Sequence, residues 1–89
     1  MIRRPDVGEH VIYCDPKGID HDALVTADWG KCINVVYVTK DASRHDQYGR
    51  QLDRSATSVA DADSGFAVHG RYWRFPGEEK IPYNPPIAM

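Results

Sequence analysis

The 89-residue sequence lacks the short motifs that would assign it a chemistry. It has no Gly-X-Ser-X-Gly motif, no Gly-rich phosphate-binding loop and no His-Glu-X-X-His motif, so common signatures of hydrolases, nucleotide-binding enzymes and zinc peptidases are absent. The adjacent carboxylates of Glu78 and Glu79 fall in a segment with no rigid element to hold them in a productive geometry. We therefore predict that the protein is not an enzyme and uses no cofactor.

The chain also lacks an excess of basic residues and a long apolar run. It has 11 Lys and Arg against 13 Asp and Glu, a formal net charge of -2, whereas nucleic-acid binding usually requires a basic surface. The longest apolar run, Ile33–Val38, is interrupted by Asn34 and is far shorter than a transmembrane helix. Met1–Asp6 has no apolar segment of the kind that forms a secretory signal. We expect a soluble protein made in a cytosol, with no membrane contact, and a nucleic-acid partner would require a local basic patch.

Three β-rich runs joined by tight turns occupy the first half of the chain. They cover Glu9–Cys14, Asp22–Ala27 and Cys32–Val38, and polar and apolar residues alternate in the first two. The connections, Asp15–Gly18 and Trp29–Lys31, contain the Pro and Gly residues that tight turns favour. Three strands joined in this way form a meander, and a meander this short must curl on itself to bury a core.

Cysteine is scarce, since only Cys14 and Cys32 are present. In an up-down-up meander one thiol ends the first strand and the other begins the third, about a strand length apart, whereas a disulfide needs Cα atoms within about 7 Å. We predict two free, mostly buried thiols. The histidines are scattered, without the close pairs that place two ligands on one element, so we predict no metal site. They are His10, His21, His45 and His69.

The segment Thr39–Ser55 is strongly polar, with only Tyr48 and Leu52 as possible apolar anchors. A structureless loop of this length is uncommon in a compact domain and is often functional. The alternative is a protruding hairpin that turns at Gln47–Arg50. Thr57–Val59 is predicted to be a short strand after this polar segment.

An aromatic strand, Gly70–Phe75, closes the ordered part of the sequence and ends at Pro76 and Gly77. Because side chains alternate across a strand, its residues are predicted to lie on two faces. We expect two to fill the interior, Trp73 and Phe75, and two to cover the outside, Tyr72 and Arg74.

These runs together predict an all-β domain, a small, strongly bent five-stranded barrel. Residues 1–6 form an N-terminal arm, 7–76 the barrel with its long polar excursion, and 77–89 a Pro-rich C-terminal tail. Ile81–Pro86 favours the polyproline II conformation, which leaves backbone groups unpaired and available to another surface.

The pattern resembles two known groups of proteins. The Gly-acid-X-Val opening, the meander and the late short strand resemble SH3-like barrels over about residues 7–76. Three segments, Val7–Tyr13, Ala23–Thr26 and Tyr72–Pro76, resemble small uncharacterised proteins of tailed bacteriophages. That resemblance implies a viral origin and a location in the virion or the host cytoplasm, and it brings no catalytic residues with it.

The favoured hypothesis is a non-enzymatic viral structural or interaction protein. It would be a capsid-decorating or tail-associated subunit that docks on a major virion protein or on copies of itself. Its exposed rings and guanidinium groups are the side-chain types enriched at interfaces. The predicted partner-binding residues are Trp29, Tyr48, Tyr72, Arg74 and Tyr83.

Two alternatives remain open at this point. A phage anti-defence protein could sequester a nucleotide signal, with guanidinium groups clamping the phosphates and Trp29 or Tyr72 stacking on the base. The candidate ligand-binding residues are Arg44, Arg50, Arg54, Arg71 and Arg74. A nucleic-acid-binding accessory barrel is the second alternative, and it predicts an affinity that falls steeply with salt.

Overall fold

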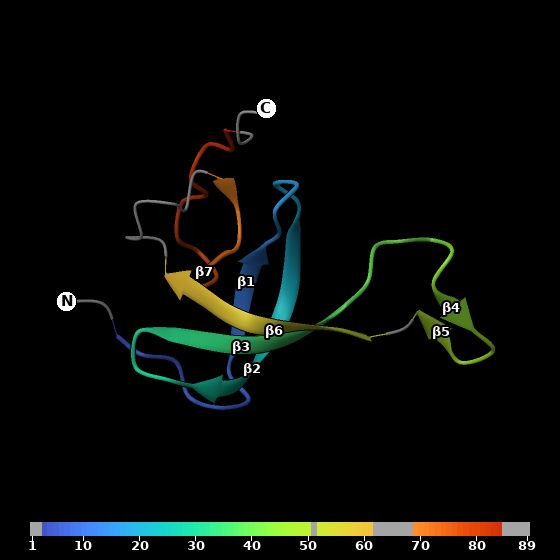
Figure 1. The fold of residues 1–89 in the computed structure, drawn as a ribbon, viewed down its shortest axis with the longest axis horizontal. Helices are drawn as coiled ribbons and strands as arrows, with labels where there is room; N and C mark the ends of the chain where they lie inside the picture. The colour runs from blue at the N-terminus through green and yellow to red at the C-terminus, as the bar shows by residue number, and fades with distance from the viewer. Residues whose placement is uncertain (1–2, 51, 62–68, 85–89) are drawn as a thin grey trace.

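The computed structural model describes residues 3–50, 52–61 and 69–84, with the backbone alone at 53–58 and 61. Its strands, shown in Figure 1, are β1 (His10–Cys14), β2 (Asp20–Asp28), β3 (Cys32–Val38), β4 (His45–Asp46), β5 (Gly49–Arg50), β6 (Leu52–Asp61) and β7 (Tyr72–Arg74). Five of them form a closed barrel in the order β1-β2-β3-β6-β7. The predicted all-β fold with a five-stranded barrel is confirmed. No helix in the described ranges is long and apolar enough to cross a membrane.

The barrel is an antiparallel meander closed by one short strand. β1 pairs with β2, β2 with β3 and β3 with β6, all antiparallel. The register shifts between Val25 and Ala27 and between Ile33 and Val35, and such bulges bend a strand and increase its twist. β7 then pairs antiparallel with β1 and parallel with β6, which joins the two edges of the sheet and closes the barrel.

The core lies inside the barrel and is built from alternate residues of each strand. Trp73 is buried there and meets the ring of Phe75 edge to face, with ring centroids 5.0 Å apart. The predicted inward direction of these two rings is confirmed. The other buried members of this cluster are Val11, Tyr13, Ala23, Val25, Ile33, Val35 and Val59.

The opposite face of β7 is also buried, so the prediction that Tyr72 and Arg74 cover the outside is wrong. The segment 75–84 folds back over this face. The Tyr72 hydroxyl accepts a hydrogen bond from the backbone N–H of Ile81 (3.0 Å), and Arg74 donates two hydrogen bonds to the Asp20 carboxylate (2.9 and 3.2 Å). The alternation itself was correct, but a strand of three residues has no solvent face when a later segment lies on it.

The C-terminal segment is held by the β1–β2 turn. The Tyr83 hydroxyl donates to the Pro16 carbonyl (2.6 Å), and Lys80 donates to the Gly18 carbonyl (2.7 Å). A Cβ at Gly18, where φ is +84°, would lie 2.6 Å from the Tyr83 ring, so only glycine fits beneath that ring. The described part of the tail, 77–84, therefore packs on its own barrel, and its two last prolines, at 85 and 86, lie outside the described residues.

The N-terminal arm also packs on its own barrel. Pro5 is buried, and the Arg3 guanidinium bonds both oxygens of Glu9 (2.7 and 3.0 Å) while lying 4.1 Å from the centre of the Phe75 ring. Arg4 donates to the Asp28 carboxylate (2.6 Å). The hydrogen bonds from Arg3 and from the backbone N–H of Asp6 lower the pKa of Glu9 to about 2.

The polar segment after β3 forms a hairpin rather than a structureless loop. β4 and β5 make a separate two-stranded sheet, which projects from the barrel on the right of Figure 1. The turn falls at Gln47 and Tyr48, where the Asp46 carboxylate accepts a hydrogen bond from the Tyr48 N–H (2.8 Å). The side chain of Tyr48 is 89% exposed, so the hairpin presents an aromatic ring at its tip.

Both cysteines are free, as predicted. Cys14 is buried beside Tyr72, and burial raises the pKa of its thiol. Cys32 is partly buried at the start of β3. Cys14, being buried, is not in the accessible surroundings that make a cysteine reactive.

Truncating an inward side chain and truncating an outward side chain of the sheet should change the free energy of unfolding by different amounts. Ile33→Ala removes a fully buried side chain and should lower the free energy of unfolding by about 2–5 kcal/mol. Leu24→Ala removes an outward side chain of β2 and should change it by less than about 0.5 kcal/mol. Urea denaturation followed by tryptophan fluorescence measures both values, and equal losses would contradict the assignment of inner and outer faces.

Candidate functional site

The β1–β2 turn is organised by the carboxylate of Asp15. Its Oδ1 atom accepts hydrogen bonds from the backbone N–H groups of Lys17 (2.8 Å) and Ile19 (3.0 Å), the local bonding that makes Asp a common turn residue. Its Oδ2 atom lies 2.8 Å from Nε2 of His21. One carboxylate therefore fixes both the turn and the imidazole that follows it.

His21 is buried between aromatic rings near one end of the barrel. Only 5% of its surface is exposed, and its ring centroid lies 4.4 Å from that of Tyr37 and 6.0 Å from that of Tyr13. Because an ionised carboxylate only accepts, Nε2 carries the hydrogen that points to Asp15. The other ring nitrogen, Nδ1, is buried without a hydrogen-bond partner among the described residues.

The pKa of Asp15 shows that the pair is held with the carboxylate ionised. Burial acts to raise this pKa, but the hydrogen bonds from His21, Ile19 and Lys17 outweigh it and bring the pKa below the ordinary value of 3.8. Because the folded pKa is lower than the unfolded value, the charged carboxylate stabilises the folded state at pH values above that unfolded value. The Asp15–His21 pair is thus part of the fold as well as part of the site.

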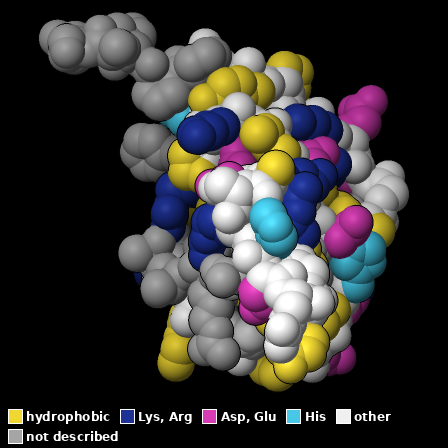
Figure 2. Space-filling model, turned by 90° about the vertical axis from the view of Figure 1, so that its right-hand side faces the viewer, with side chains coloured by type: hydrophobic (Ala, Val, Ile, Leu, Met, Phe, Trp, Pro, Cys, Tyr) yellow, Lys and Arg dark blue, Asp and Glu magenta, His cyan; other side chains and the backbone are white. Residues whose placement is uncertain are grey.

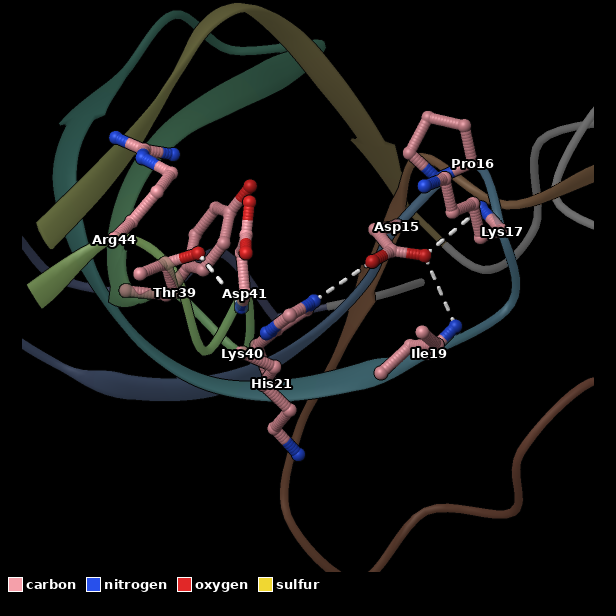
Figure 3. A pocket seen from close by; sticks show the side chains of 10 residues that line it. Asp15, Pro16, Lys17, Ile19, His21, Thr39, Lys40, Asp41 and Arg44 are labelled. Carbon is pink, nitrogen blue, oxygen red and sulfur yellow. Dashed lines mark hydrogen bonds and ion pairs between the residues drawn. The ribbon is translucent and has the colours of Figure 1, made fainter. Parts of the chain in front are cut away.

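A cavity of about 610 Å³ opens beside this pair. Figure 3 shows the pair on one side and residues of the segment after β3 facing it across the space. Basic side chains from three positions contribute to the wall. The lining residues are Asp15, Pro16, Lys17, Ile19, His21, Tyr37, Thr39, Lys40, Asp41 and Arg44.

Asp41, the second carboxylate of the cavity wall, also accepts hydrogen bonds within its own loop. It accepts hydrogen bonds from the backbone N–H (3.0 Å) and the hydroxyl (2.7 Å) of Ser43, and these bonds lower its pKa. Its own N–H donates to Oγ1 of Thr39 (3.1 Å). Both acidic groups are thus engaged in shaping their loops, whereas the ammonium groups of Lys17 and Lys40 make no ion pair with a described residue.

The Asp15–His21 pair has no nucleophile beside its free nitrogen among the described residues. An Asp–His pair activates a nucleophile only when a hydroxyl or thiol lies within hydrogen-bond distance of the free imidazole nitrogen, and Nδ1 of His21 has no such partner within the described chain. Within the same residues, no group of three or more His, Cys, Asp or Glu side chains is placed to hold a metal ion.

The structure scatters the predicted partner-binding residues. Trp29 is exposed in the β2–β3 turn and Tyr48 at the hairpin tip, whereas Tyr72 and Arg74 are buried under the C-terminal segment. Tyr83 is partly buried on the β1–β2 turn. These five residues do not form one surface, although Trp29 and Tyr48 are individually available to a partner.

The predicted ligand-binding arginines are only partly brought together. Arg44 lines the cavity, and Arg50 donates to the carbonyl of Thr39, another lining residue (3.4 Å). Arg71 is exposed just before β7, with φ at +56°. Arg54 lies on β6 opposite Val36, and its side chain is outside the description. The Asp15–His21 pair was not predicted from the sequence. The available signal was the hairpin turn, because residues on its two sides lie next to each other.

A second feature missed at the level of sequence is an apolar surface on the outside of the barrel. Leu24 of β2 pairs with Val36 of β3, and Val38 of β3 pairs with Leu52 of β6. Since directly paired residues and residues two apart share a face, these four side chains line one side of the sheet. We call them the outer strip. Leu24, Val38 and Leu52 are 49%, 50% and 63% exposed.

Charges of both signs are mixed on the side of the molecule that carries the hairpin. Figure 2 looks at this side and shows basic and acidic groups interspersed with apolar side chains. Among the described residues of this face, the basic groups are interrupted by acidic and apolar ones, whereas nucleic-acid binding usually requires a basic surface.

Comparisons of the chain with protein-family models, with curated proteins and with solved structures found no match.

The Asp15–His21 pair predicts a pH-dependent contribution to stability. Asp15→Ala leaves the buried imidazole without its partner and should lower the free energy of unfolding at pH 7 by about 1–3 kcal/mol. Because the folded pKa of Asp15 is lowered, its contribution is present above the unfolded value and is lost as the pH falls through the folded value. The difference from wild type should therefore shrink in acid.

The matched control is an exposed pair of the same chemistry. His10 and Asp22 lie 2.8 Å apart with the Asp22 side chain 82% exposed, so Asp22→Ala should change stability by less than about 0.5 kcal/mol. Chemical denaturation between pH 2.5 and 8 measures both variants. A loss for Asp15→Ala that stays constant down to the acid limit would contradict the linkage.

Proposed function

We propose that this chain is a non-enzymatic interaction protein of a virus, a capsid-decorating or tail-associated subunit that docks on a larger virion component. The docking surface combines the outer strip with the β4–β5 hairpin. The observation that carries this proposal is the exposure of paired apolar side chains, Val38 and Leu52, beside a projecting hairpin tipped by Tyr48. The partner is a major virion protein or another copy of this chain.

The outer strip has no evident role in the stability of the isolated barrel. Its side chains lie on the opposite face from the core, and contiguous exposed apolar surface of this kind commonly marks an interaction site. Burying apolar area contributes roughly 25 cal/mol per Å². A small domain that covers such a surface with a partner therefore gains stability from the association.

The hairpin supplies a second contact with different geometry. Tyr48 has a large ring with one polar atom, and such residues often anchor interfaces in a pocket of the partner. The turn is preset by the bond from the Tyr48 N–H to Asp46 (2.8 Å). Ordering the turn in advance reduces the entropy lost on binding.

The viral part of the proposal is supported by the sequence resemblance to tailed-bacteriophage proteins. The described parts of the N-terminal arm and of the C-terminal segment pack on the barrel through residues such as Pro5 and Tyr83. The proposed contact is accordingly assigned to the sheet face and the hairpin.

The test is mass spectrometry of purified particles of the virus that encodes the chain. Wild-type chain should co-purify with the particles, and Tyr48→Ala combined with Leu52→Ser should reduce its amount at least tenfold because both proposed contacts are weakened. Val7→Ser, which changes an exposed apolar residue outside the strip, should leave incorporation unchanged.

Circular dichroism of the purified variants checks that each retains the fold. Absence of the wild-type chain from the particles would refute the virion assignment. Equal incorporation of the folded double variant would refute the proposed docking surface.

A further inference from the structure

We propose that the surface beneath the C-terminal segment binds the same segment of a second copy of the chain, so that two copies exchange residues 80–83. We call this surface the receiving surface. Its members, from the end of β1, the β1–β2 turn and β7, are Cys14, Pro16, Gly18 and Tyr72. None of them belongs to the outer strip or to the β4–β5 hairpin, so the inference does not rest on the proposed docking function.

The segment is held by individual contacts rather than by strand pairing. Ile81 packs on the cluster that contains Tyr72, and its backbone N–H donates to the Tyr72 hydroxyl (3.0 Å). The Tyr83 ring lies over Gly18, and its hydroxyl donates to the Pro16 carbonyl (2.6 Å). Within the described chain, no residue of the segment belongs to a strand. Two side chains, two positions apart, therefore anchor an extended stretch of chain.

A basic group completes the contact and defines the occupant. The Lys80 ammonium donates to the Gly18 carbonyl (2.7 Å) and lies 3.5 Å from the Asp20 carboxylate. The receiving surface thus fits a segment with a basic residue, an aliphatic residue and a tyrosine at these spacings. Lys80–Tyr83 supplies all three groups, and for this reason we assign the surface to the same segment of a second copy.

The contacts of this segment are separate from the core of the barrel. Ile81 packs on the small cluster of Cys14 and Tyr72, which is distinct from the cluster of buried residues inside the barrel. The closed order of five strands includes no residue after Arg74. Residues 80–83 can therefore leave the receiving surface without opening the barrel.

A turn at Pro76 and Gly77 directs the segment back onto its own barrel (Figure 1). At Gly77 φ is +94°. Glu78 closes the turn, because its backbone N–H donates to the Phe75 carbonyl (3.1 Å) and its carboxylate accepts from the Phe75 N–H (2.7 Å). When this turn opens, the four residues 76–79 span roughly 13 Å, which carries the segment away from its own barrel toward a neighbouring copy.

Exchange costs little because the same contacts form in both arrangements. Each contact of Ile81 and Tyr83 is made to the other copy instead of to the same chain, so the two states differ in the turn and in the entropy of association. A short linker gives the attached segment an effective concentration in the millimolar range. Exchange therefore takes place where copies are held close together, at concentrations that compete with this value.

The experiment combines two variants that each lack one half of the contact. Ile81→Ser with Tyr83→Ala empties the receiving surface. Gly18→Ala, whose Cβ would collide with the Tyr83 ring, displaces a segment that is itself intact. Unlabelled Gly18→Ala chain is added to the ¹⁵N-labelled emptied variant and followed by ¹H–¹⁵N NMR. We expect amides in 14–20 and at Tyr72 to move toward their wild-type positions.

Unlabelled wild-type chain is a second donor of the segment. It should produce the same shifts at roughly tenfold higher concentration, because its own receiving surface competes for the segment. A capped synthetic peptide of residues 78–84 tests the contact without a second barrel. Its Tyr83→Ala form should bind the emptied variant at least tenfold more weakly, whereas its Glu79→Ala form changes an exposed side chain and should bind within twofold.

Four outcomes would overturn the proposal. The first is an emptied variant that does not fold, since the segment would then belong to the core. The second is the absence of shifts with every donor, and the third is equal binding of the Tyr83→Ala peptide. The fourth is binding of the peptide but of neither full-length donor, which would exclude exchange between copies. The particle assay for the docking surface is independent of each of these results.

Discussion

Closure of the barrel by β7 is the constraint on which the other features depend. A strand of only three residues, Tyr72–Arg74, joins β1 to β6 and places Trp73 in the centre of the core. At Gly70, just before this strand, φ is +87° and an added Cβ would collide with the carbonyl of Asp15. The closing strand is thereby packed directly against the β1–β2 turn that contains Asp15.

The β1–β2 turn connects stability with the site. Its Asp15 carboxylate holds the turn backbone and His21, while Pro16 and Gly18 hold the C-terminal segment through Tyr83. The same turn therefore forms part of the cavity wall and part of the surface that holds the C-terminal segment. The hairpin and the outer strip are different, because they are exposed elements whose side chains contribute little to the core.

The residues predicted from the sequence to bind a partner or a nucleotide lie in different parts of the structure. The proposed docking surface includes Tyr48 and the outer strip. It excludes Tyr72 and Arg74 because both are buried. Of the arginines predicted to bind a nucleotide, Arg44 lines the cavity beside the Asp15–His21 pair. Trp29 and Tyr72, the rings predicted to stack on a base, do not line this cavity, and the aromatic ring in its wall is that of Tyr37.

The sequence by itself determined the all-β class, the meander, the free cysteines and the inward direction of Trp73 and Phe75. These follow from local alternation and from Pro- and Gly-containing turns, which act over a few residues. Only the tertiary structure decided that 75–84 covers Tyr72 and Arg74, that Asp15 binds His21, and that Val38 and Leu52 pair on the outer face. Those outcomes depend on strand register and on contacts between distant segments, and a single sequence does not encode either in its local pattern.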